Sequence, residues 1–309
     1  MKAARIHNFG GPEVIVVEDV SRPVPATGEV LVRVAAAGVG PWDALIRDGK
    51  SKVSPPPPLT LGSDFSGVVE ETGPSVSQFK KGDEVYGVTN PEFVGAQAEY
   101  AVASATMIAR KPMRLSHLEA ASAPVVAVTA WQMLHDYAHV QARQTALILG
   151  AAGNVGAYAV QLAANAGLHV VALVGSKDIE YVRGLGAETV NDYQSGANFE
   201  PSVRPVDVVI DTVGGNTRDR SLHVLKAGGI LVSVVSTTPL PSSSNVRTVF
   251  FYVDVTSDRL NTVSKLFDSE KLLPQVGTVL PISQVRTAHE MLAGKPHRRG
   301  KIVLQIPTS

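Results

Sequence analysis

A glycine-rich turn between an apolar strand and an apolar helix is the feature that most constrains the fold of this chain. The stretch TALILGAAGNVGAYAVQLAANAG at 145–167 opens with a short β-branched and leucine-rich run and continues with small apolar residues at helical spacing. In this strand–turn–helix context, glycines serve the tight turn, the close approach of backbone to a pyrophosphate, and helix–strand packing. The turn therefore predicts a dinucleotide-binding site formed by Gly150, Gly153, Asn154, Val155 and Gly156. The alternative is a glycine-rich turn that binds nothing.

The pattern of apolar runs changes near residue 122. Before it, short β-branched runs are separated by Gly and Pro turns, which indicates a mostly β domain. After it, buried strands alternate with helical stretches, which predicts a doubly wound parallel sheet of the Rossmann type in an α/β protein. The tail again shows strand, helix and strand after the sheet is complete. We expect a nucleotide-binding domain at 123–267 and a discontinuous catalytic domain at 1–122 and 268–309.

Composition excludes several classes of function. The chain has no cysteine, which removes disulfides, thiol nucleophiles, thiolate zinc sites and iron–sulfur clusters. Lys plus Arg and Asp plus Glu each number 28, so no net field attracts nucleic acid or an anionic membrane. No apolar run is long enough to span a bilayer. We expect a cytoplasmic protein with no nucleic-acid and no membrane partner.

The end of the second strand of the predicted sheet bears on the choice of cofactor. An NAD site commonly has an acid there, which accepts a hydrogen bond from the ribose 2′-hydroxyl. Here HVVALV is followed by Gly175, Ser176 and Lys177. A hydroxyl donor and an ammonium would admit and neutralise a 2′-phosphate, so the sequence predicts NADPH over NADH. The alternative is that Lys177 is a solvated lysine at a helix start.

A longer series of motifs resembles a known family. The motifs GEVLVRVAAAGVGPWDALIRDGK, LGSDFSGVVEETG, FKKGDEVYG, AVTAWQML, DVVIDTVGG, LKAGGILVSV and GKIVL occur in the order found in the zinc-independent branch of the medium-chain dehydrogenase/reductase superfamily, the quinone oxidoreductase or zeta-crystallin-like group. The resemblance implies a GroES-like catalytic domain beside the Rossmann domain. It also implies reduction of quinones, enals, enones or enoyl thioesters.

The resemblance assigns expected roles to further residues of the cofactor site. Thr129 would face the nicotinamide and Tyr193 would lie near the adenosine phosphate. The cofactor trough would be lined by Thr212, Val213, Val234, Val235 and Ser236. Each has a structural alternative: a helix-interior threonine bonded to its own backbone, a loop anchor, or valines of a strand core.

The same resemblance bears on metals and proton donors. Zinc-dependent relatives bind a catalytic metal at positions that here read Gly40 and Ser63, so we expect no metal. Asp43 and Asp64 are the nearest candidate acids to the expected reaction centre. A structural cap or turn is the alternative role for each.

The leading hypothesis is an NADPH-dependent, zinc-independent reductase that transfers hydride to a small conjugated carbonyl, either a quinone or an α,β-unsaturated aldehyde or ketone. One alternative is an NADPH-binding, redox-responsive partner protein with little turnover. Another is an enoyl-thioester reductase, which would need a basic patch; the only compact basic cluster is His297, Arg298 and Arg299 with Lys301. The apolar, β-prone segment at 247–255 predicts a homodimer joined through an edge strand, with a buried strand as the alternative.

Overall fold

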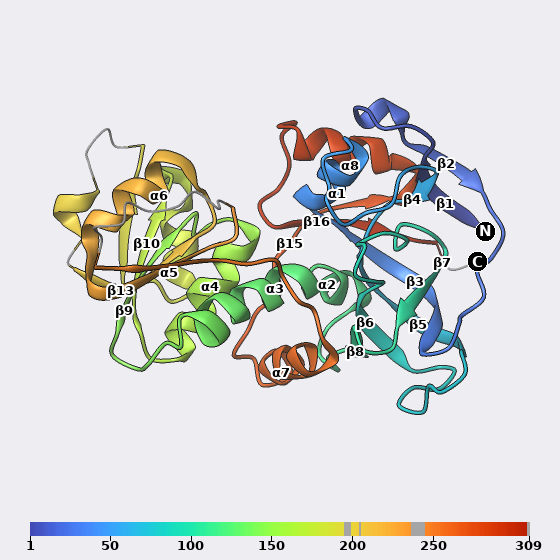
Figure 1. Ribbon diagram of the computed structural model, residues 1–309, viewed down its shortest axis with the longest axis horizontal. Helices are drawn as coiled ribbons and strands as arrows, with labels where there is room; N and C mark the ends of the chain where they lie inside the picture. The colour runs from blue at the N-terminus through green and yellow to red at the C-terminus, as the bar shows by residue number, and fades with distance from the viewer. Residues whose placement is uncertain (195–198, 204, 236–244, 308–309) are drawn as a thin grey trace. The chain divides into compact units, whose positions relative to one another are not determined.

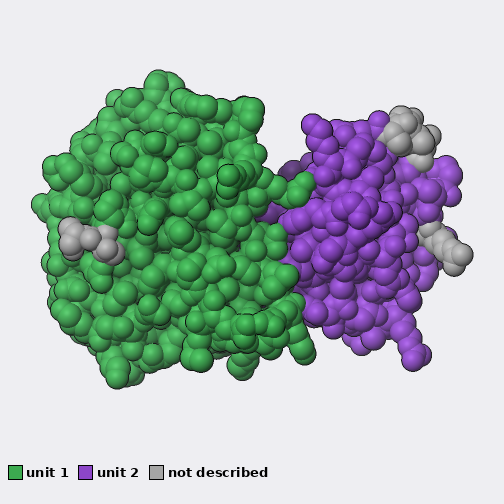
Figure 2. Space-filling view, turned by 180° about the vertical axis from the view of Figure 1, so that it is seen from behind, with its two compact units in different colours: residues 1–125, 255–309 green, residues 126–254 purple. Residues whose placement is uncertain are grey.

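The computed structural model describes residues 1–194, 199–203, 205–235 and 245–307. The chain forms two compact units, which Figure 2 colours separately. Unit 1 comprises Met1–Val125 and Val255–Ser309, and unit 2 comprises Val126–Asp254. Within the described ranges, no helix is both long enough and apolar enough to cross a membrane.

Unit 2 is built on a six-stranded parallel sheet in the order β11-β10-β9-β12-β13-β14. Its strands are β9 (Thr145–Leu149), β10 (His169–Val174), β11 (Thr189–Asp192), β12 (Val206–Asp211), β13 (Leu225–Ser233) and β14 (Arg247–Phe250). Its helices are α4 (Asn154–Asn165), α5 (Ile179–Gly184) and α6 (Gly215–Ser221), which Figure 1 shows beside the strands. This order is that of the doubly wound dinucleotide-binding fold, so the predicted Rossmann sheet is confirmed.

The sheet of unit 2 forms because its strands are apolar on both faces. Leu147 and Leu149 of β9 are fully buried, and they pack in one cluster with Leu173 of β10, Val209 of β12 and Leu231 of β13. Such continuous apolar runs are typical of parallel strands that are covered on both sides. Because all six strands are parallel, their carboxyl ends lie along one edge of the sheet.

Unit 1 is mostly β, as predicted. A seven-stranded sheet has the order β15-β16-β3-β5-β6-β8, with β7 paired to β3, and a three-stranded sheet has the order β2-β1-β4. The strands are β1 (Lys2–Ile6), β2 (Val16–Asp19), β3 (Glu29–Val39), β4 (Leu59–Thr60), β5 (Asp64–Thr72), β6 (Glu84–Val88), β7 (Tyr100–Ser104), β8 (Ile108–Arg110), β15 (Val276–Pro281) and β16 (Lys301–Gln305). The helices are α1 (Pro41–Arg47), α2 (His117–Ala121), α7 (Ser257–Asp268) and α8 (Val285–Leu292). Helix α3 (Pro124–Trp131) contains the boundary between the units and continues into a π-helix at Gln132–Tyr137.

The second boundary differs from the expected one at 267. Helix α7 belongs to unit 1, because the buried Tyr86 hydroxyl donates to the carbonyl of Leu260 at 2.8 Å and the Ser257 hydroxyl donates to the carbonyl of Ile108 at 2.6 Å. The amphipathic pattern of this helix predicts a buried face without identifying the sheet that covers it. The expected strand at 247–255 also ends early, at Phe250.

Candidate functional site

The glycine turn after β9 has a geometry that other residues cannot adopt. Gly150 has a φ of +72°, and a Cβ there would lie 2.5 Å from the Thr212 hydroxyl. A Cβ on Gly156, in the first turn of α4, would lie 2.1 Å from the carbonyl oxygen of Gly150. Both positions thus require glycine, which brings the start of α4 close to the end of β9.

This turn lies where the order of strands reverses. β9 is followed in the chain by β10 on one side, while β12 pairs with β9 on the other. The Thr212 hydroxyl, just after β12, donates to the carbonyl of Leu149 at 2.8 Å and joins the two strand ends. In open α/β sheets, ligands bind outside the carboxyl ends of the strands at this switch point.

Helix α4 starts at the switch point with an exposed turn. Gly153 precedes it in an extended conformation, with φ −76° and ψ 171°, and is exposed, while Asn154 and Val155 are half-buried. The first N–H groups of a helix have no partner within it and attract anions. The residues predicted to bind a pyrophosphate are therefore together at one accessible helix start.

Apolar side chains are exposed along the same carboxyl edge. Val213 after β12 is 47% exposed, Val235 after β13 is 51% exposed, and Tyr193 after β11 is 58% exposed. Val234 is half-buried. These exposed apolar side chains suit contact with the flat faces of a bound nucleotide.

Two further residues predicted for the cofactor site, Thr129 and Ser236, are not among the exposed residues described at this edge. Thr129, in α3, is buried, with only 5% of its surface exposed. Ser236 lies outside the described residues. The structure therefore brings together the glycine turn, Thr212, Val213 and the valines after β13, and gives no placement for Ser236.

Asp211 is a residue of this edge that sequence reasoning missed. It ends β12, is fully buried, and accepts from the backbone N–H groups of Val213 at 3.0 Å and Gly214 at 2.8 Å. Its other oxygen accepts from the hydroxyl of Ser233, the last residue of β13, at 2.7 Å. One carboxylate thus fixes the ends of two strands, and an acid closing the apolar run DVVID was the available signal.

The end of β10 contains a second missed acid. Gly175 is buried while Ser176 and Lys177 are exposed. The Ser176 hydroxyl donates to the carboxylate of Asp192 at 2.5 Å. Asp192 ends β11 and pairs in register with Val174, the last residue of β10. The three residues that follow β10 include no acid, but the end of the neighbouring strand β11 supplies one.

In unit 1, Asp64 forms a buried ion pair. Its carboxylate lies 2.8 Å from the ammonium of Lys301, and the side chains are 0% and 1% exposed. The other oxygen of Asp64 accepts from the backbone N–H of Val125 at 3.0 Å. Burial raises the pKa of Asp64, and the ammonium of Lys301 opposes that rise. Lys301 is therefore not part of the exposed basic cluster expected at 297–301, which reduces that cluster to His297, Arg298 and Arg299.

Asp43 lies close to the same ion pair. It caps α1 by accepting from the N–H of Gly40 at 2.7 Å. Its pKa is raised to about 7, chiefly by burial and in part by the charge of Asp64, while the hydrogen bond from Gly40 and the charge of Lys301 lower it. Trp42 covers the group: the Lys301 ammonium lies 4.0 Å from the centre of its ring. Asp43 and Asp64 are thus two buried carboxyl groups close to one buried cation, Lys301, which pairs with Asp64. The alternative that Asp43 is a structural cap agrees with its hydrogen bond from Gly40.

Gly40 and Ser63, the positions that the resemblance equates with zinc ligands, both contact Trp42. The Ser63 hydroxyl accepts from the indole N–H of Trp42 at 3.0 Å, and a Cβ on Gly40 would lie 2.5 Å from the Trp42 ring. Among the residues with described positions, no three His, Asp or Glu side chains gather in a way that could hold a metal ion.

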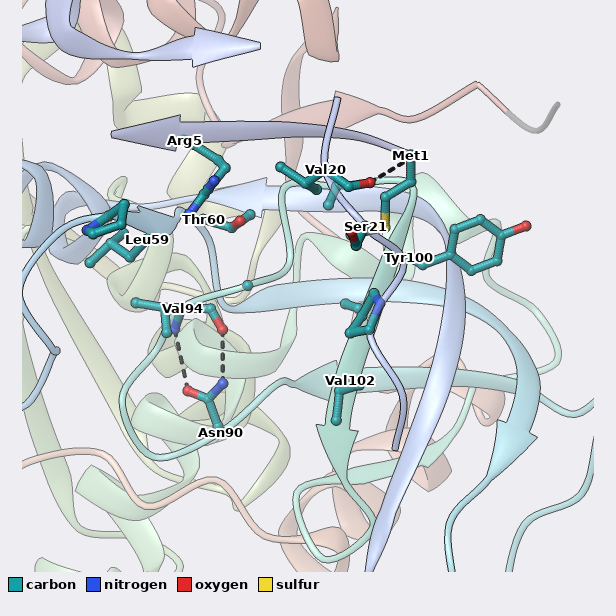
Figure 3. Close-up of a pocket in the computed structure, with 15 residues that line it drawn as sticks. Met1, Arg5, Val20, Ser21, Leu59, Thr60, Asn90, Val94, Tyr100 and Val102 are labelled. Atoms are coloured by element: carbon teal, nitrogen blue, oxygen red, sulfur yellow. Dashed lines mark hydrogen bonds between the residues drawn. The ribbon is translucent and has the colours of Figure 1, made fainter. Parts of the chain in front are cut away.

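Unit 1 has a surface pocket of about 520 Å³, which contains none of the predicted site residues. Figure 3 shows the residues that line it. Its walls are largely apolar, from Val20, Leu59 and Val94. The Asn90 amide is hydrogen bonded to both backbone groups of Val94, as the dashed lines mark. We assign no function to it.

Comparisons with known proteins agree with this architecture. Residues 26–113 match the alcohol dehydrogenase GroES-like domain, and residues 185–304 match the zinc-binding dehydrogenase domain. The quinone oxidoreductase of Sus scrofa is 31% identical, covering 99% of this chain and 98% of the relative. A mitochondrial NAD(P)H oxidoreductase of Bos taurus is 33% identical, over 90% of this chain and 82% of the relative.

Solved structures give the same result. The quinone oxidoreductase from Coxiella burnetii has a TM-score of 0.89 at 32% identity and covers 99% of each chain. An alcohol dehydrogenase superfamily protein from Novosphingobium aromaticivorans has a TM-score of 0.92 at 32% identity. The predicted GroES-like and Rossmann domains are thus confirmed, and this chain belongs to the quinone oxidoreductase family of the medium-chain dehydrogenase/reductase superfamily.

Proposed function

We propose that this protein is an NADPH-dependent oxidoreductase that reduces a quinone or an α,β-unsaturated carbonyl compound by hydride transfer. The observation that carries the proposal is the glycine turn at the switch point of the unit 2 sheet, where Gly150 and Gly156 admit no side chain. Relatives named quinone oxidoreductase and NAD(P)H oxidoreductase support the same chemistry.

The residues of this edge fit a nicotinamide dinucleotide. The N–H groups at the start of α4, from Asn154 onward, would bind the pyrophosphate. Val213 and Val235 would contact the flat faces of the cofactor with their exposed side chains. Asp211 positions this wall by holding the N–H groups of Val213 and Gly214. When bound, a reduced nicotinamide supplies a hydride from its C4 atom.

The preference for NADPH rests on the end of β10. Lys177 is exposed there, and its ammonium would neutralise a 2′-phosphate bound at this strand end. Tyr193 is exposed at the end of the neighbouring strand and supports a role beside the adenosine phosphate.

We also propose that the reaction proceeds without zinc and without a dedicated protein acid. Gly40 and Ser63 offer no nitrogen or sulfur ligand, and the chain has no cysteine to replace them. Asp43 and Asp64 are fully buried and already bound to Gly40 and Lys301. The enolate or hydroquinone anion left by hydride transfer can take its proton from water.

The cytoplasm is our proposed location, and the relatives named NAD(P)H oxidoreductase are named as mitochondrial. The exposed basic residues His297, Arg298 and Arg299 give little support for a carrier-bound thioester substrate, since Lys301 is buried in an ion pair.

The test follows NADPH absorbance with purified protein, using a simple para-quinone and a short-chain enal separately, with NADH as the parallel cofactor. We expect consumption of NADPH with at least one acceptor. Binding of NADPH without consumption would favour the alternative of a redox-responsive binding protein. Failure to bind either cofactor would contradict the assignment of the glycine turn.

A further inference from the structure

The segment that follows β11 closes over the end of β10. The backbone N–H of Tyr193 donates to the carbonyl of Val174 at 3.1 Å. A Cβ on Gly175 would lie 3.1 Å from the amide oxygen of Gln194. The carboxyl ends of the two strands thus form one continuous surface, on which Ser176 and Asp192 meet.

Asp192 uses both carboxylate oxygens at this surface. One accepts from the hydroxyl of Ser176 at 2.5 Å, and the other accepts from the backbone N–H of Gln194 at 2.8 Å. A serine hydroxyl has a single O–H to donate. With that hydrogen donated to Asp192, the Ser176 hydroxyl would present only its lone pairs to a bound phosphate and would not attract it.

The charge of Asp192 acts in the same direction. Its carboxylate lies beside the residues at the end of β10, where the ribose of a dinucleotide binds in this fold. A carboxylate there accepts a hydrogen bond from a 2′-hydroxyl and repels a 2′-phosphate. Lys177, which directly follows Ser176, carries a positive charge that would attract a 2′-phosphate.

From these contacts we propose that Asp192 is a specificity-determining residue that lowers the preference for NADPH over NADH. The inference rests on the proposed function for the identity of the cofactor. It assigns to the third strand of the sheet the acid that such sites commonly carry on the second. Lys177 and Asp192 would then act in opposite directions on a bound 2′-phosphate.

The test compares dissociation constants for NADPH and NADH in the wild type, Asp192→Asn and Glu188→Gln. Asparagine keeps the size of the side chain and an oxygen that accepts a hydrogen bond, so it removes mainly the charge. Glu188 precedes the opposite end of β11, where it pairs with His169 at 2.9 Å, so its variant removes a carboxylate of the same unit away from the site. Binding is measured by fluorescence titration, independently of turnover.

We expect Asp192→Asn to raise the ratio of the NADH to the NADPH dissociation constant about tenfold, the size of one solvent-screened charge contact. Glu188→Gln should leave that ratio within twofold. Ser176→Ala should also change NADPH affinity less than twofold, since its hydroxyl is committed to Asp192.

An unchanged ratio in Asp192→Asn, or an equal shift in Glu188→Gln, would overturn the proposal. A tenfold loss of NADPH affinity in Ser176→Ala would also overturn it, since the hydroxyl would then be binding the phosphate. Cofactor binding with the expected ratios but no turnover would refute the proposed function while leaving Asp192 as the specificity residue. A wild type that binds neither cofactor would refute both.

Discussion

Asp43 is a buried carboxyl group that retains its proton near neutral pH. Its pKa is raised from 3.8 to about 7, chiefly by burial, which outweighs the hydrogen bond from Gly40 and the charge of Lys301. Between these values the folded chain holds a proton that the unfolded chain has released, so stability falls as pH rises through this window. The gap corresponds to roughly 4 kcal/mol of unfolding free energy.

We predict that Asp43→Asn flattens this dependence. Urea unfolding from pH 4 to pH 8 should show the wild type losing stability relative to the variant, with the difference complete above pH 7. Asp48→Asn, at the other end of α1, is the control: partial burial raises its pKa, but hydrogen bonds from Arg47 and Lys50 lower it overall, so its contribution is lost only at acid pH. Parallel curves for the wild type and Asp43→Asn would contradict the prediction.

Lys177 offers a separate prediction about the cofactor. Lys177→Ala should weaken NADPH binding by about 1.5–3 kcal/mol, the contribution of charge-assisted hydrogen bonds, and barely change NADH binding. Arg183→Ala removes a nearby positive charge that is already paired with Glu180, and should affect neither cofactor. Isothermal titration calorimetry measures the dissociation constants of both cofactors for the wild type and the two variants, and equal losses for the two cofactors would rule out a 2′-phosphate role.

At the scale of secondary-structure elements, the ends of β12 and β13 depend on one carboxylate. Asp211 receives two backbone hydrogen bonds and one from Ser233 in a fully buried position. Asp211→Ala should destabilise unit 2 by about 2–3 kcal/mol and weaken cofactor binding, because three donors lose their acceptor. Asp207→Ala, near the other end of β12, removes an acceptor of Thr145 and Lys226, and should lower stability without changing cofactor affinity. Thermal unfolding and titration together separate the two effects.

The whole molecule shows which parts of the structure can be predicted from local patterns. The strand–turn–helix at 145–167 and the alternation after it were sufficient for the sheet of unit 2, since each signal lies within a few residues. Contacts between distant segments were not predictable: Lys301 looked like part of an exposed basic turn, yet it pairs with Asp64 in the core. Asp192 was missed for a similar reason, because the carboxylate that meets Ser176 comes from a neighbouring strand. The boundary at α7 was misplaced because an amphipathic pattern does not identify its packing partner.

At the scale of the whole molecule, the edge strand β14 bears on the oligomeric state. β14 ends the sheet of unit 2 next to β13, with Arg247 and Thr248 exposed and Val249 and Phe250 half-buried. A terminal strand presents backbone donors and acceptors along its outer edge, and two copies can pair across a two-fold axis. We predict a homodimer joined through β14, with a mass near twice 32.6 kDa in sedimentation at micromolar concentration. Thr248→Lys places two added positive charges near each other in that dimer and should dissociate it, whereas Asn261→Lys, at an exposed position of α7, should not. A monomeric wild type would exclude the dimer, and a dimer unaffected by Thr248→Lys would place the interface elsewhere.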